Sequence, residues 1–211
     1  MEFTPIRRNA ISRKERIALA PQLLDCGARA VTISKVLGLS ATDARNIYRD
    51  KFGTKSASGK TPESESWYLQ TDSRRIHSSM FLQIYDDVMK FNYDPVRGFL
   101  RAYSLYYDDI CQKQTDLTPE RAHLLIRMKR DSERLGAKGE IHVRQVSKSV
   151  FGAETNKTKS GKKIINKDDE REVDVMVFKS CRKCGVKHIV SKASLNYKCP
   201  SCEDAEAYRQ Q

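Results

Sequence analysis

The chain of 211 residues, with 39% hydrophobic and 31% charged side chains, is long enough to bury one ordinary core and a small additional module. No run approaches the roughly 20 apolar residues of a membrane-spanning helix, and the charged N-terminal segment lacks the apolar stretch of a signal peptide, so we expect a cytoplasmic protein without a membrane partner. The net charge of +12 and the isoelectric point near 9.5 favour a polyanionic partner such as nucleic acid, although charge alone does not establish one.

Residues 12–49 are predicted to be helical. Apolar side chains recur there at three- and four-residue steps, as they do on the buried face of a helix. Gly38 interrupts this pattern, Ser40 follows at the position of a helix cap, and Asp43 stands where an acid complements the helix N-terminus. The pattern therefore predicts a helix, a short turn and a second helix.

The segment 30–52 resembles a helix-turn-helix with Gly38 in its turn. The second helix would expose five side chains able to contact base edges or phosphates: Thr42, Arg45, Asn46, Arg49 and Lys51. Helical pairs joined by a glycine turn are also common inside helical cores. At this point the sequence therefore leaves both insertion into a DNA groove and a plain packing role open.

The remainder of the first 135 residues is predicted to form a helical body. Residues 53–66 contain almost no apolar side chain, which predicts an exposed loop. Residues 77–90 then repeat apolar side chains at helical spacing. An Asp-Pro pair at residues 94–95 predicts the start of a helix that places aromatic and apolar side chains up to Ile110 on one side, and a Thr-Pro pair at residues 118–119 predicts another.

After residue 136 the pattern changes to strands. Apolar residues alternate at 141–143 and at 173–177, as in strands with one buried face. We predict that residues 136–175 form a basic insertion, a β-hairpin with a mobile loop. The loop carries four candidate DNA contacts, Lys157, Lys159, Lys162 and Lys163.

Residues 176–211 are predicted to form a zinc-binding ribbon and a short tail. Cys181 and Cys184 form one Cys-x-x-Cys pair, and Cys199 and Cys202 form a second. Each pair can present two thiolates to one tetrahedral ion, and a short β-hairpin would bring the pairs together. One structural Zn²⁺ is the default occupant, and iron in a rubredoxin-like site is the chemical alternative. The overall fold is thus predicted to be mainly α, a multi-helix body followed by a small β-rich zinc module.

Further residues of the predicted zinc module have candidate roles. His188 lies close enough to compete as a ligand, but four cysteines already complete the site, so we expect a solvated or phosphate-facing side chain. Four cations suit contacts with a phosphate backbone, the alternative being that they serve solubility or offset the charge of the zinc site: Arg182, Lys183, Lys187 and Lys192. Outside the module, Cys26 and Cys111 lack partners at ligand spacing and are expected to be buried.

Several segments, in this order, resemble the FlhC family of transcription activators over residues 20–203. They are Asn46-Ile-Tyr-Arg, His77-Ser-Ser-Met-Phe and Phe99-Leu-Arg-Ala-Tyr, followed by the paired Cys-x-x-Cys motifs where family members hold zinc. The resemblance implies an activator that binds double-stranded DNA upstream of promoters, works in a hetero-oligomer with the small helical protein FlhD, and recruits RNA polymerase. The basic insertion departs from flagellar members, so genes for flagella and genes for conjugative transfer are both candidate targets.

The motifs of zinc enzymes are absent from the sequence. A zinc deaminase needs His-x-Glu and Pro-Cys-x-x-Cys, whereas here proline follows Cys199 and His142 is followed by Val-Arg. Neither a glycine-rich phosphate loop nor His-Glu-x-x-His occurs. We therefore predict no enzymatic activity. The alternative to an activator is a zinc-ribbon module that binds RNA or docks proteins, which would share the charge and the metal without any promoter preference.

Overall fold

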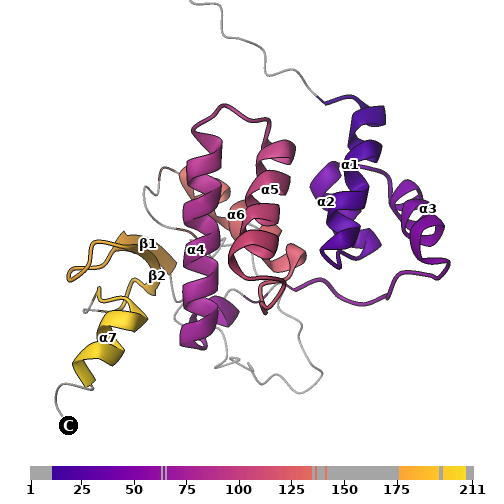
Figure 1. The fold of residues 1–211 in the computed structure, drawn as a ribbon. Coiled ribbons are helices and arrows are strands. Elements are labelled where there is room, and N and C mark those ends of the chain that lie inside the picture. The colour runs from indigo at the N-terminus through magenta and orange to yellow at the C-terminus, as the bar shows by residue number, and fades with distance from the viewer. Residues whose placement is uncertain are drawn as a thin grey trace, which may run out of the picture.

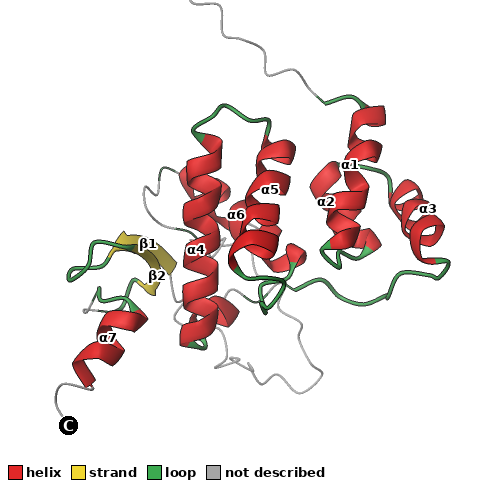
Figure 2. Cartoon of the chain, in the orientation of Figure 1, coloured by secondary structure: helices red, strands yellow, loops and turns green. Residues whose placement is uncertain are grey.

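The computed structural model describes residues 11–62, 64, 66–134, 136, 141, 176–194 and 197–207. Within these ranges the fold is mainly helical with one two-stranded sheet, as the sequence predicts (Figures 1 and 2). The elements in chain order are α1 (Arg13–Asp25), α2 (Ala30–Leu37), α3 (Ala41–Phe52), the 3-10 helix η1 (Ser66–Leu69), α4 (Asp72–Met89), α5 (Pro95–Ser104), the π-helix η2 (Leu105–Ile110), α6 (Pro119–Arg134), β1 (Met176–Ser180), β2 (Lys187–Ser191) and α7 (Pro200–Ala207). Among the described residues, no helix combines the length and the apolar character needed to cross a membrane.

The N-terminal unit contains three helices where the sequence analysis expected two. The helix before Gly38 is divided because the chain turns at Gly27, whose φ of 77° lies in the left-handed region that favours glycine at a helix end. The expectation of a single helix before Gly38 was therefore wrong. Apolar spacing continues across this break, which is why periodicity alone did not detect it.

The turn between α2 and α3 has the predicted features. Gly38 adopts a left-handed conformation with φ 62°, and the Ser40 side chain accepts a hydrogen bond from the Asp43 backbone N–H at 3.0 Å. Arg16 of α1 donates to the Leu37 carbonyl at 2.9 Å, which satisfies one of the last carbonyls of α2. The segment 30–52 is thus a helix, a tight turn and a second helix, held against α1.

Glu120 of α6 links this unit to the rest of the body. Its carboxylate accepts a hydrogen bond from Arg29 at 2.5 Å and another from the Thr32 hydroxyl at 2.8 Å, so that it joins the start of α2 to α6. The side chains of Arg29 and Glu120 are 22% and 13% exposed, and charge-assisted hydrogen bonds this well shielded from water are stronger than exposed ones.

The helical body packs around an aromatic cluster on α4. Phe81 is fully buried, and its ring lies edge-on to Phe99, Tyr103 and Tyr106 of α5 and η2, with ring centroids 5.7 to 6.2 Å apart. α4 begins at Asp72, earlier than the predicted start of apolar periodicity, because the Thr71 side chain caps it. The polar first turn of α4 carries no apolar pattern from which this start could be read.

The helix after Asp94 does not keep one regular face. Asp94 caps it, with Pro95 in the first turn, as predicted, but after Ser104 the backbone widens into the π-helix η2. This widening changes the phase of the side chains. Ile110, which was predicted to share one side with Phe99 and Tyr103, is 48% exposed while those two are buried, so that expectation was wrong.

Cys26 and Cys111, the two cysteines outside the Cys-x-x-Cys pairs, are half-buried, whereas the sequence analysis expected them to be buried. Burial raises the pKa of the Cys26 thiol to about 11, with smaller contributions from Asp108 and Asp25, and burial also raises the pKa of Cys111. Both thiols are therefore poor nucleophiles. Of the predicted strand at 173–177, residues 176 and 177 lie in β1. Residues 173–175, the predicted strand at 141–143 apart from Ile141, and the loop that carries Lys157, Lys159, Lys162 and Lys163 lie outside the described residues.

We expect Glu120→Ala to lower the free energy of unfolding by about 1–3 kcal/mol, because Arg29 and Thr32 would lose their shared acceptor in a partly buried place. Urea unfolding followed by circular dichroism measures this change. Glu133→Ala, which removes an exposed acid from the same helix, is the matched control. Equal loss in the two variants would contradict the assigned link.

His123 of α6 predicts a pH dependence of stability. Burial, followed by the nearby cations Arg127, Lys35 and Arg130, lowers its pKa to about 4, below the value of about 6.5 for an unfolded histidine. As the pH falls below about 6.5, the unfolded chain binds a proton that the folded chain does not bind, so stability decreases. The loss through this residue should reach about 2 kcal/mol between pH 7 and pH 5.

The measurement is a pair of urea titrations at pH 7 and pH 5 for the natural chain and for His123→Gln. The variant should lose less stability on acidification by that amount. The same loss in both proteins would show that His123 does not titrate in this way.

Candidate metal centre

The first Cys-x-x-Cys pair lies in the turn of a β-hairpin. β1 and β2 are antiparallel, with Phe178 opposite Ile189, and the Cys181 N–H donates to the Val186 carbonyl at 2.8 Å. Gly185 has a φ of 76°, a left-handed conformation that the reversal of the chain requires. The first pair therefore lies in the turn of the hairpin, whereas the sequence analysis expected only a short hairpin that brings the two pairs together.

The second pair lies at the start of a helix that the sequence analysis did not predict. Cys199 precedes α7, Pro200 is its first residue, and Cys202 lies in its first turn, with the Cys202 N–H donating to the Cys199 carbonyl at 2.9 Å. The predicted short tail is thus largely helical. Proline directly after Cys199 was the available signal, because proline suits the first position of a helix.

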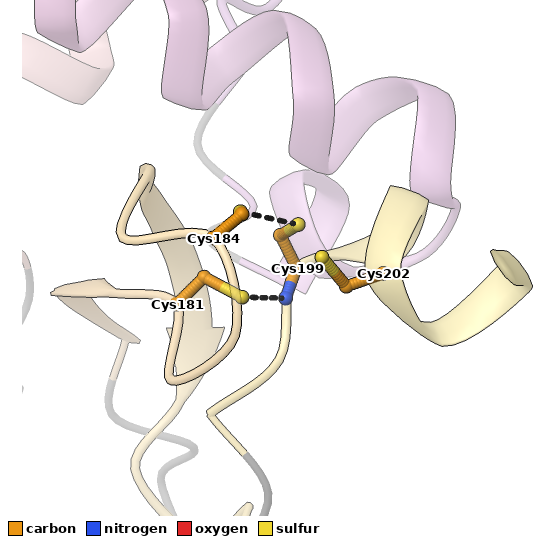
Figure 3. Close-up of side chains that lie close together, drawn as sticks. All are labelled: Cys181, Cys184, Cys199 and Cys202. Carbon is orange, nitrogen blue, oxygen red and sulfur yellow. Dashed lines mark hydrogen bonds between the residues drawn. The ribbon is translucent and has the colours of Figure 1, made fainter. Parts of the chain in front are cut away.

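The four sulfur atoms converge on one point. The sulfur atoms of Cys181, Cys184, Cys199 and Cys202 all lie within 4.8 Å of one another, and those of Cys184 and Cys199 are 3.6 Å apart (Figure 3). A tetrahedral ion bound at about 2.3 Å from each sulfur needs sulfur atoms about 3.8 Å apart. The cluster therefore matches a closed four-coordinate metal site, and the chain carries a metal-binding arrangement here.

Hydrogen bonding within the cluster favours an anionic ligand. Backbone N–H groups, first that of Cys184 and then those of Cys199 and Lys183, lower the pKa of Cys181 to about 5. The pKa of Cys202 is instead raised to about 12, first by its hydrogen bond with Cys199 and then by burial. Neighbouring thiols cannot all ionise while they repel one another, so a cation among them is what would let all four act as thiolates.

The metal centre is joined to the helical body through α4 (Figure 1). The Ile189 backbone N–H donates to the buried hydroxyl of Ser79 at 2.8 Å, and the side chains of Met176 and Ile189 belong to the main hydrophobic core. Arg75 of α4 also lies 3.7 Å from Glu203 of α7. A polar bond, an ion pair and apolar packing thus fix the position of the hairpin on the body.

His188 does not have the solvated role that was expected of it. Its side chain is 3% exposed, and within the part of the chain that the structure describes neither ring nitrogen has a hydrogen-bond partner. Because residues in a strand alternate between faces, His188 shares its face with the buried Val190. The expectation was wrong because the sequence does not show that this face is covered.

The candidate phosphate contacts of the hairpin are exposed, but some of these cations already have partners within the module. Arg182, Lys183, Lys187 and Lys192 lie at the surface. Lys183 forms an ion pair at 3.1 Å with Glu206 of α7, an acid that the sequence analysis overlooked. Arg182 lies over the ring of Tyr197 at 5.2 Å, and Lys179 lies over the same ring at 4.8 Å. Part of the positive charge is therefore used within the module itself.

The candidate contacts of the helix-turn-helix unit lie together on α3. The side chains of Thr42, Arg45, Asn46 and Arg49 are exposed, whereas Lys51 pairs with Asp25 of α1. Figure 1 shows α3 and the β-hairpin at opposite ends of the molecule, with α4, α5 and α6 between them. The structure thus gathers the described candidates into two separate groups.

Comparison with known proteins adds a family likeness. The model of the family described as "Flagellar transcriptional activator (FlhC)" matches residues 6–139. The chain is 30% identical over 125 residues to the flagellar transcriptional regulator FlhC of Variovorax paradoxus (strain S110), which is 57% of this chain and 61% of the relative. It is 28% identical over 113 residues to the FlhC of Cupriavidus metallidurans (strain ATCC 43123 / DSM 2839 / NBRC 102507 / CH34), covering 53% of each chain. It is also 30% identical over 135 residues to that of Sodalis glossinidius (strain morsitans), covering 62% and 67%. The matches thus span a little over half to two thirds of the relatives' length.

We expect Cys184→Ser to release the bound metal, because three thiolates and a hydroxyl hold a soft ion less well than four thiolates. Elemental analysis of the purified chain measures the metal content. Cys26→Ser, which changes a cysteine outside the cluster, should retain the metal. Equal metal content in the two variants would contradict the assignment of Cys184 as a ligand.

Proposed function

The chain belongs to the FlhC family of flagellar transcriptional activators, and from this we propose that it is the DNA-binding subunit of a transcription activator. The match covers the helix-turn-helix unit and the helical body. Because the relatives are matched over only part of their length, promoter binding, partner binding and recruitment of RNA polymerase are parts of this proposal.

The observation that carries the proposal is the polar outer face of α3. Ala44 is fully buried against the rest of the unit, while Thr42, Asn46 and Arg49 lie on the opposite, exposed side. These side chains can donate hydrogen bonds to base edges, accept hydrogen bonds from them, or bind phosphates. A tight turn fixes α3 relative to α2, and Glu120 ties α2 to the body, so the exposed helix is presented on a rigid support.

The metal centre has a structural role in this proposal. We take the ion to be zinc, because four thiolates suit it and close its coordination sphere, which leaves no position for substrate or water. When bound, zinc supplies the stability that two short strands lack, of the order of 10 kcal/mol in zinc-finger peptides. The side chains of the cluster then hold the hairpin cations at the surface, and the site performs no catalysis.

The partners are assigned through the family. We propose a hetero-oligomer with an FlhD-like small helical protein, acting in the cytosol on DNA upstream of promoters for flagellar or conjugative-transfer genes, with recruitment of RNA polymerase. Exposed apolar side chains support the idea of a protein partner: Phe91 is 77% exposed and Tyr93 is 40% exposed in the loop between α4 and α5.

One observation favours the alternative of a module that binds RNA or docks proteins. Tyr197 carries Lys179 and Arg182 against its ring, and an aromatic ring flanked by cations is also a means of binding unpaired bases. This surface belongs to the metal centre and does not involve α3. The two candidate functions therefore predict different nucleic-acid preferences.

We expect the metal-loaded chain, co-expressed with an FlhD-like partner, to enrich a shared motif from a randomised 30-base-pair duplex library at about 150 mM salt, since a specific DNA binder retains sequence preference at that salt. An equal concentration of structured RNA should not displace the duplex. Displacement by RNA together with no enriched motif would favour the alternative module.

A further inference from the structure

A groove runs between α2, α3 and the loop that follows α3. Arg45 and Arg49 line it from α3, the first residues of α2 line it as well, and Lys55 with residues 56–59 lines it from the loop. Among the described residues that line this groove, every charged side chain is a cation. The groove is therefore a place of concentrated positive charge beside the candidate DNA-contacting helix.

Hydrogen bonds to α2 hold the loop that lines the groove in place. The Ser56 hydroxyl accepts a hydrogen bond from the Ala30 backbone N–H at 3.0 Å, at the start of α2. Further along, the Lys35 ammonium donates to the Thr61 hydroxyl at 3.0 Å. The sequence analysis predicted an exposed loop, and most of residues 53–60 are exposed, but these two bonds tie the loop along α2. The position of Lys55 relative to α3 is thereby restrained.

The charges of α3 are arranged asymmetrically. Successive residues of a helix turn by about 100°, so Arg45 lies on one flank of the exposed face, and Asp43 and Asp50 lie on the other. Thr42 and Asn46 fall between these flanks. On the other flank Asp43 pairs with Arg13 at 2.9 Å, and Asp50 adds a second negative charge. A polyanionic strand would therefore be attracted more strongly to the Arg45 flank, which borders the groove.

We propose that the groove holds one strand of the sugar-phosphate backbone of duplex DNA, and that Lys55 contacts a phosphate together with Arg45 and Arg49. α3 then lies with its cationic flank toward this strand. Thr42 and Asn46 are left directed toward the base edges. The inference rests on the proposed DNA-binding function, and it adds Lys55 and its loop as a contact and fixes the orientation of the helix.

The test is a salt titration in which the metal-loaded chain, co-expressed with the FlhD-like partner, binds a labelled 30-base-pair duplex of arbitrary sequence, because phosphate contacts do not depend on sequence. For Lys55→Ala, we expect the slope of log affinity against log salt to fall in magnitude by about 0.9, with an affinity loss of roughly eightfold at about 0.1 M salt. Lys55→Arg should keep the natural slope. Lys90→Ala removes one cation at the end of α4 and should leave the slope unchanged.

The outcomes separate the two proposals. If the metal-loaded natural chain, co-expressed with the FlhD-like partner, shows no salt-dependent binding to the duplex, the DNA-binding function fails and the groove assignment fails with it. If the natural chain binds and Lys55→Ala has the same slope, or if Lys90→Ala lowers the slope equally, the groove assignment alone is overturned. A lower slope confined to Lys55→Ala supports it.

Discussion

The rest of the structure depends on the two-sided packing of α4. Phe81 on one side is buried in the aromatic cluster with α5 and η2, and two residues earlier Ser79 accepts the backbone N–H of Ile189 from β2. Residues two apart on a helix point in nearly opposite directions, so one helix serves both the body and the metal centre. Two short strands cannot fold alone, and here they are stabilised by packing on α4 beside the four clustered sulfur atoms. The position of the cysteine cluster therefore depends on the integrity of the body.

Different observations support the functional assignments at the two ends of the molecule. The family likeness covers residues 6–139 and so includes α3, the groove and the body, but it ends before Cys181, the first cysteine of the metal centre. The metal centre is supported instead by its own geometry, four sulfur atoms within 4.8 Å of one another. If both ends bind the same duplex, α3 and the hairpin must do so from opposite ends of the body, which makes them separate contacts whose contributions can be removed independently (Figure 1).

Local rules predicted much of this arrangement. The spacing of four cysteines identified the metal centre, and residues such as Gly38, Ser40 and Asp94 marked helix ends because their chemistry acts within one turn. The failures were of two kinds. Gly27 and the π-helix η2 change the direction or phase of the backbone without changing the apolar pattern, so Ile110 was misplaced. The hydrogen bond of Ile189 to Ser79 joins segments more than a hundred residues apart, and local spacing reports neither this contact nor the burial of His188.

The central claim is that a metal-stabilised chain binds duplex DNA through α3. Hydrogen–deuterium exchange of the metal-loaded full-length chain, with and without duplex DNA, tests it most directly, because slowed exchange locates the bound surface by segment. The account predicts slower exchange on DNA binding in α3 and the loop at residues 53–59, with little change in the buried helix α4. Slowing that is absent from α3 and confined to the helical body would contradict it.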